Sequence, residues 1–143
     1  MSYLSTIISI VPRLPPSIDG VGDYALNLAR QLRKDFNIQT HFIVGNPTWT
    51  GSLEIEGFPI SQITDSSANK LVELLSYLYS PVLLHYVGYG YAKRGCPVWL
   101  VDGLQQWKSY ILSDRLLPCF MRSLLLATDL GKVLFGCHLY KEI

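Results

Sequence analysis

A pair of glycines flanked by carboxylates is the first group of residues in this chain that could do chemistry. The segment reads Asp19-Gly20-Val21-Gly22-Asp23-Tyr24. Its glycines let the backbone approach a ligand, and a helix beginning here would present free N–H groups to a phosphate or a sugar hydroxyl. The spacing fits neither the Gly-x-Gly-x-x-Gly dinucleotide motif nor a P-loop. The segment therefore predicts a phosphate- or sugar-binding turn, and a plain turn capped by Asp19 or Asp23 is the structural alternative.

A histidine followed by tyrosines is the second such group. His85 and Tyr86 come at the end of an apolar run, and Tyr89 and Tyr91 follow in a glycine-containing segment. A histidine there could hydrogen-bond a sugar hydroxyl or a pyrophosphate oxygen, and tyrosines could stack on a sugar or a lipid acceptor. The alternative is that all of them are packed core residues. His41 lies in the middle of another apolar run, where a packed side chain is the expectation.

The elements that position these residues follow from hydrophobic spacing. Apolar β-branched runs and amphipathic stretches alternate along the chain, and they predict strands at 7–11, 38–44, 58–63 and 82–87 and helices at 21–34 and 69–79. Residues 96–107 indicate the start of a further helix or an ordered loop. This alternation predicts an α/β fold with a Rossmann-like doubly wound parallel sheet. Ligands of such sheets bind beyond the carboxyl ends of the strands, so both groups should lie on one side.

Composition limits the class of protein. The chain has 143 residues, 49% of them hydrophobic, which is enough for one domain with a sizeable core. A net charge of +1 gives no general attraction to nucleic acid or an anionic membrane. Pro118 and Arg122 interrupt the most apolar segment, so no stretch reaches the roughly 18 residues of a transmembrane helix. We expect a cytoplasmic protein with three reduced thiols, no metal site and no nucleic-acid partner.

Two motifs together resemble a known family. An apolar strand, a proline-rich loop and Gly-Val-Gly-Asp-Tyr at 20–24 are followed by Leu-Leu-His-Tyr-Val-Gly-Tyr-Gly at 83–90. This pattern resembles the N-terminal half of family 4 glycosyltransferases, which are retaining enzymes of GT-B fold, and it covers about residues 5–108.

The resemblance implies a function and a site. The complete enzyme would transfer a hexose from a nucleotide-sugar to a glycan or lipid-linked acceptor, with no cofactor beyond that co-substrate. The loop at 19–24 would face the inter-domain cleft and touch the acceptor and the donor phosphate. His85 would line the cleft as the catalytic candidate, with Tyr86 and Tyr89 among the substrate-binding residues. The donor-binding domain of the family, with its Glu-x7-Glu motif, has no counterpart in these 143 residues.

The segment 109–143 is expected to be a poorly specified tail. Related domains continue with a strand ending in Phe-His-Glu and then Ser-Ser-Phe-Trp-Leu-Ser-Pro, and neither is present in this reading. Residues 117–122 can be encoded as CTA CCA TGT TTC ATG AGG, which spells Thr-Met-Phe-His-Glu from the third base. Residues 130–141, treated in the same frame, give Trp-Glu-Ser-Ser-Phe-Trp-Leu-Ser-Pro-Leu-Gln. The hypothesis is therefore that the tail is out-of-frame sequence following a frameshift.

These expectations define a Rossmann-like glycosyltransferase domain at 1–108 that is inactive alone, because a retaining transfer needs donor and acceptor held in one closed cleft. A non-catalytic module that binds a glycan, or that pairs with a separate donor-domain chain, is the alternative. A flavodoxin-like or response-regulator-like domain is disfavoured, because clustered acidic residues do not follow the first strand.

Overall fold

One six-stranded sheet organises the computed structural model, which describes residues 5–78, 80–86, 88–92, 97–113 and 124–127, with side chains for 6–78, 80–86, 90–92 and 97–110. The strands lie in the order β3-β4-β2-β1-β5-β6. In chain order they are β1 (Ser5–Val11), β2 (Ile38–Val44), β3 (Glu54–Ile55), β4 (Phe58–Gln62), β5 (Val82–His85) and β6 (Leu124–Ala127). The first strand is therefore central, with later strands added on both sides of it.

The sequence analysis predicted a purely parallel sheet, but the sheet is mixed. β1 pairs in parallel with β2 and β5, and the pairs β2–β4 and β5–β6 are also parallel. Only β3, among the strands described, runs antiparallel to its neighbour, β4. The turn between them consists of Glu56 (φ 51°) and Gly57 (φ 84°). Two consecutive positive φ values are typical of a tight hairpin turn, which explains the short antiparallel edge.

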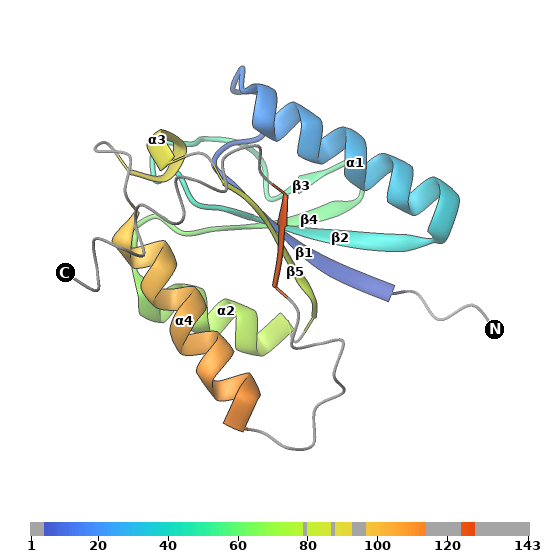
Figure 1. The fold of residues 1–143 in the computed structure, drawn as a ribbon. Coiled ribbons are helices and arrows are strands. Elements are labelled where there is room, and N and C mark those ends of the chain that lie inside the picture. Colours follow the sequence, from blue (N-terminus) through green and yellow to red (C-terminus); the bar gives the residue numbers. More distant parts are fainter. Residues whose placement is uncertain (1–4, 79, 87, 93–96, 114–123, 128–143) are drawn as a thin grey trace.

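Helices lie on both faces of the sheet (Figure 1). α1 (Gly20–Phe36) covers one face, and α2 (Ala68–Leu78) and α4 (Val98–Ser113) lie side by side on the other. Contact between α2 and α4 is close at Gly103, where an added Cβ would lie 2.7 Å from Leu71 Cδ2. A single-turn helix, α3 (Gly88–Tyr91), follows β5. The fold is thus an α/β layered structure with a helix layer on each side.

Two hydrophobic cores flank the sheet, because alternate residues of each strand point to opposite faces. Ile8 and Ile10 of β1 pack with Leu71, Leu75 and Leu100 on the side of α2 and α4. On the other side, the core residues contributed by β1, β2, β4 and α1 are Val11, Phe42, Val44, Phe58, Ile60, Ala25, Leu26 and Ala29. Together the two cores hold the central strands in place, and with them the loops at their carboxyl ends.

The predicted elements are present with small boundary differences. α1 runs past the predicted residue 34 because Asn37, in the left-handed conformation at φ 54°, ends it. Residue 108, the predicted domain boundary, lies inside α4. Of the predicted tail, 109–113 extend α4 and 124–127 form β6, while 114–123 and 128–143 lie outside the described residues. Among the helices described, none combines the length and the apolarity that crossing a membrane requires.

Candidate functional site

The candidate site lies where the strand order reverses, between β1 and β5. The chain goes from β1 to β2 and β4 on one side, and it returns to place β5 on the other side. Ligands of open α/β sheets bind where the connections leaving such a pair of strands diverge, which here is the region beside Val11 and His85. We refer to this region as the crevice. α1 begins at this same end of the sheet, as does α3 (Figure 1).

Asp19 caps α1. Its side chain accepts hydrogen bonds from backbone N–H groups at the helix start, which the sequence analysis had assigned to a phosphate or a sugar hydroxyl. Its Oδ1 accepts hydrogen bonds from the backbone N–H of Val21 at 2.9 Å and of Gly22 at 3.3 Å. Its Oδ2 also lies 3.8 Å from a guanidinium nitrogen of Arg13. A phosphate at this helix start would have to displace a carboxylate that the chain itself provides. Asp23 is exposed in the first turn and adds a second acidic side chain.

The two glycines of this turn have different roles. Gly22 is buried, and an added Cβ would lie 2.1 Å from the backbone oxygen of Arg13. That position therefore needs glycine so that α1 can pack against the loop after β1. Gly20 is exposed, and an added Cβ would meet nothing within 4 Å. Of the pair, Gly20 is the one that leaves open space beside the helix start.

His85 is a buried polar side chain at this end of the sheet. It is 1% exposed, and its Nε2 has no hydrogen-bond partner within the part of the chain that the structure describes. Burial lowers the pKa of His85 to about 4, so the imidazole is neutral at neutral pH. An unsatisfied buried nitrogen costs about 1–3 kcal/mol, and a ligand that hydrogen-bonds it would remove that cost.

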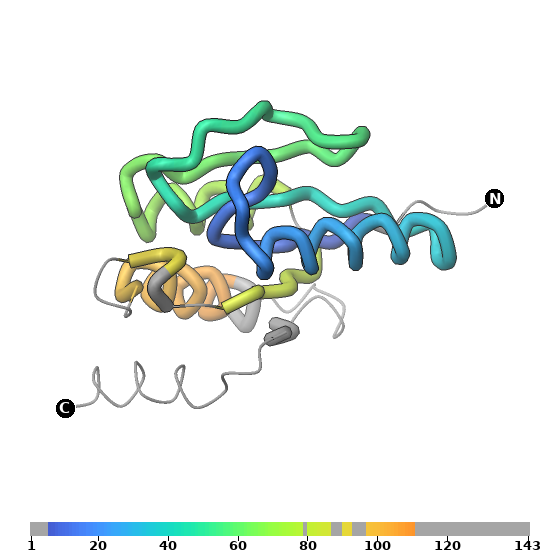
Figure 2. Tube along the Cα trace, turned by 90° about the horizontal axis from the view of Figure 1, so that it is seen from above, coloured from blue at the N-terminus to red at the C-terminus, as the bar shows by residue number. Residues whose placement is uncertain are grey.

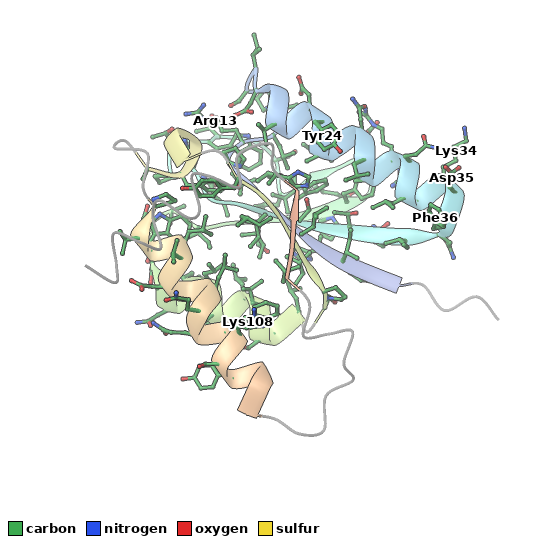
Figure 3. All side chains as sticks on the ribbon, viewed as in Figure 1. Arg13, Tyr24, Lys34, Asp35, Phe36 and Lys108 are labelled. Carbon is green, nitrogen blue, oxygen red and sulfur yellow. The ribbon has the colours of Figure 1, made fainter. Side chains whose placement is uncertain are left out.

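Tyr24 brings α1 to the histidine. Its ring meets the His85 imidazole edge to face, with centroids 5.9 Å apart, while 59% of Tyr24 remains exposed. Figure 3 shows Tyr24 and Arg13 at the end of α1 opposite Lys34, Asp35 and Phe36. The residues from the first motif and from the second motif therefore do meet, as the carboxyl-end rule predicts, through a direct contact between Tyr24 and His85.

Tyr86 and Tyr91, which follow His85, are buried inside the protein. Tyr86 is 2% exposed and stacks on Tyr91, with ring centroids 6.3 Å apart. Tyr91 is buried, and its pKa is raised well above the ordinary value by burial, then by the nearby Asp19 and by Tyr86. The predicted stacking of Tyr86 on a substrate is thus replaced by stacking within the protein. The side chain of Tyr89 lies outside the described residues.

Sequence reasoning missed the residues that hold the surrounding loops. The indole N–H of Trp49 donates to the Leu14 carbonyl at 2.6 Å, which fixes the segment after β2 against the loop after β1 (Figure 2). Asn46 donates from Nδ2 to the Gly90 carbonyl at 3.1 Å, which joins the end of β2 to α3. The clue available in the sequence was Gly45-Asn46-Pro47 after an apolar strand, which indicated only a turn.

Other chemistry-bearing side chains lie away from the crevice. His41 Nε2 lies 2.9 Å from Ser61 Oγ across β2 and β4, and burial lowers its pKa. That environment agrees with the expectation of a packed strand residue. Among the described residues, no group of three or more His, Cys, Asp and Glu side chains could hold a metal ion.

The crevice therefore combines a neutral imidazole, whose Nε2 has no hydrogen-bond partner among the described residues, with carboxylates and an exposed tyrosine. All of these groups suit hydroxyl groups. No family model, curated protein or solved structure matches this chain.

Proposed function

We propose that the chain is the acceptor-side half of a GT-B glycosyltransferase resembling family 4, which transfers a hexose from a nucleotide-sugar to a glycan or lipid-linked acceptor. The strand order, with β1 central and helices on both faces, supports a Rossmann-like half of such an enzyme. The observation that carries the proposal is the buried, unpartnered Nε2 of His85 beside the start of α1, at the point where the strand order reverses.

The charges at the start of α1 favour binding of the acceptor over binding of the donor phosphate. Asp19 already occupies the first N–H groups of α1, and together with Asp23 it provides two carboxylates against the one guanidinium of Arg13. Carboxylates accept hydrogen bonds from sugar hydroxyls but repel phosphate. A neutral His85 likewise suits a hydroxyl, since it can accept or donate one hydrogen bond without carrying charge. The donor nucleotide would therefore be held by a second domain.

The chemistry assigned to this half is positioning. In the transfer, an acceptor hydroxyl oxygen forms a bond to the anomeric carbon, the bond from that carbon to the nucleoside diphosphate breaks, and the hydroxyl proton is released. Holding the hydroxyl in one orientation makes the step effectively unimolecular. His85 would supply one hydrogen bond to that hydroxyl, and Gly20 would leave room for the sugar.

The test is hexose transfer by a protein expressed from a gene whose reading frame is restored after about codon 108. Wild-type restored protein should transfer hexose from a nucleotide-sugar, and His85→Ala should lower turnover about tenfold, the equivalent of one lost hydrogen bond. Tyr77→Ala, at an exposed position on α2, is the control. Unchanged turnover in His85→Ala would remove the histidine from the mechanism.

A non-catalytic glycan-binding module is the second candidate. The contacts described at the crevice all join residues of the range 10–99, and this observation favours a module that binds its ligand with this chain alone. A module of this kind would bind hexosides as the isolated chain, while a restored or co-expressed donor half would confer no transfer. A neighbouring reading frame that encodes a donor domain favours the enzyme, because a lone module has no use for one.

A further inference from the structure

The hydroxyl of Tyr91 lies between the two strands that border the crevice. It is 3.1 Å from the backbone oxygen of Ile10 in β1 and 2.5 Å from that of His85 in β5. A phenol has one proton to donate, so the two carbonyls share a single donor. Because both acceptors are main-chain atoms, this contact bridges β1 and β5 at the end of their paired stretch, where Ile10 pairs with Leu84.

The ring of Tyr91 is held from several sides, which fixes where its hydroxyl points. An added Cβ at Gly45 would lie 2.6 Å from Tyr91 Cδ1, so the ring lies directly against the backbone at the end of β2. Tyr86 stacks on the ring at an interplanar angle of 22°. The indole N–H of Trp99, in α4, donates to the Tyr91 carbonyl at 3.4 Å. These contacts restrict the Tyr91 side chain to its observed position.

The residue before it is fixed as well. An added Cβ at Gly90 would lie 2.5 Å from Pro12 Cβ, in the loop that leaves β1. The Gly90 carbonyl accepts the hydrogen bond from Asn46. α3 thus contacts the ends of β1 and β2 and follows directly from β5.

We infer that Tyr91 is a positioning residue of the crevice, whose hydroxyl fixes the main chain of His85 and thereby directs the imidazole toward an acceptor hydroxyl. The inference rests on the proposed function for the identity of the ligand, while the effect on His85 is independent of it. Removing the hydroxyl alone leaves two buried carbonyls facing a C–H edge, and the strand ends are then free to shift.

The experiment compares Tyr91→Phe with Tyr77→Phe in the full chain. Tyr77 is 85% exposed on α2, so the matched substitution there removes a hydroxyl without touching the crevice. The readout is the set of imidazole ¹⁵N and ¹H NMR signals, assigned by His85→Gln and His41→Gln. Tyr91→Phe should shift the His85 signals, leave those of His41 in place, and weaken binding of methyl β-glucopyranoside about tenfold. Tyr77→Phe should change neither.

A folded Tyr91→Phe protein with wild-type His85 signals would overturn the inference. Should the variant not fold, the wild-type protein still decides: the phenolic proton of Tyr91, which is hydrogen-bonded to a buried carbonyl, must exchange slowly with water, and fast exchange overturns the inference. The two proposals can fail separately. Shifted His85 signals in a chain that binds no hexoside support the positioning role and count against the glycosyltransferase.

Discussion

Acidification should destabilise this protein through His85 in particular. Burial lowers the pKa of His85 from 6.5 to about 4, so the unfolded chain takes up a proton near pH 6.5 that the folded chain does not bind until about pH 4. When folding lowers the pKa of a group, its neutral form contributes fully to the free energy of unfolding at pH values above the pKa of the unfolded state. The contribution is lost as the pH falls from that pKa toward the pKa of the folded state. At 1.36 kcal/mol per pH unit, the whole window corresponds to about 3 kcal/mol, of which about 2 kcal/mol is lost between pH 7 and pH 5.

The assay is urea unfolding, followed by circular dichroism, at about pH 7 and about pH 5 for the wild type and His85→Gln. Wild-type protein should lose about 2 kcal/mol more than the variant, because glutamine has no proton to take up. Burial also lowers the pKa of His41, but that histidine is present in both proteins and its effect cancels. Equal losses in the two proteins would refute the account of His85 as a buried, neutral imidazole.

Three further predictions follow from the same end of the sheet and from the tail. Gly22→Ala should cost about 1–3 kcal/mol in urea unfolding, because its Cβ would meet the Arg13 carbonyl at 2.1 Å, whereas Gly20→Ala should be tolerated; equal effects would contradict the assignment of separate roles. Asp19→Ala should cost about 1 kcal/mol of stability, and Asp19→Asn, which keeps a capping oxygen without its charge, should bind inorganic phosphate more tightly than wild type in calorimetric titration. Sequencing the gene should find the codons of 117–122 spelling Phe-His-Glu in the alternative frame, and any other reading ends the frameshift hypothesis.

The long-range architecture was the predictable part of the fold. Apolar runs located β1, β2 and β5, and helical periodicity located α1, because burial of one face produces such patterns. The buried face of α1 consists of Gly22, Ala25, Leu26 and Ala29, whereas Tyr24 is mostly exposed. The sequence analysis did not predict the antiparallel hairpin of β3 and β4 at the edge of the sheet. Glu56-Gly57 before Phe58 is a short signal, and two positive φ values depend on pairing between β3 and β4 that sequence spacing does not reveal.

Sequence reasoning predicted that the two motifs lie at the same end of the sheet, but it did not predict the contacts between their residues. The carboxyl-end rule brought Tyr24 and His85 together correctly, since it depends only on topology. It could not show that Asp19 would occupy the helix start or that Gly22 would serve packing, because both depend on the path of the loop after β1. Nor could it distinguish Tyr86, which packs internally, from a tyrosine that faces a ligand.

The most direct test of the central claim is an NMR titration of the ¹⁵N-labelled chain with methyl hexopyranosides and, separately, with inorganic phosphate. The account predicts that a hexoside shifts the Nε2 signal of His85 and the Gly20 amide to saturation, that phosphate shifts neither, and that His85→Gln abolishes hexoside binding. A chain in which no hexoside moves the His85 nitrogen, or in which phosphate alone does so, would contradict it.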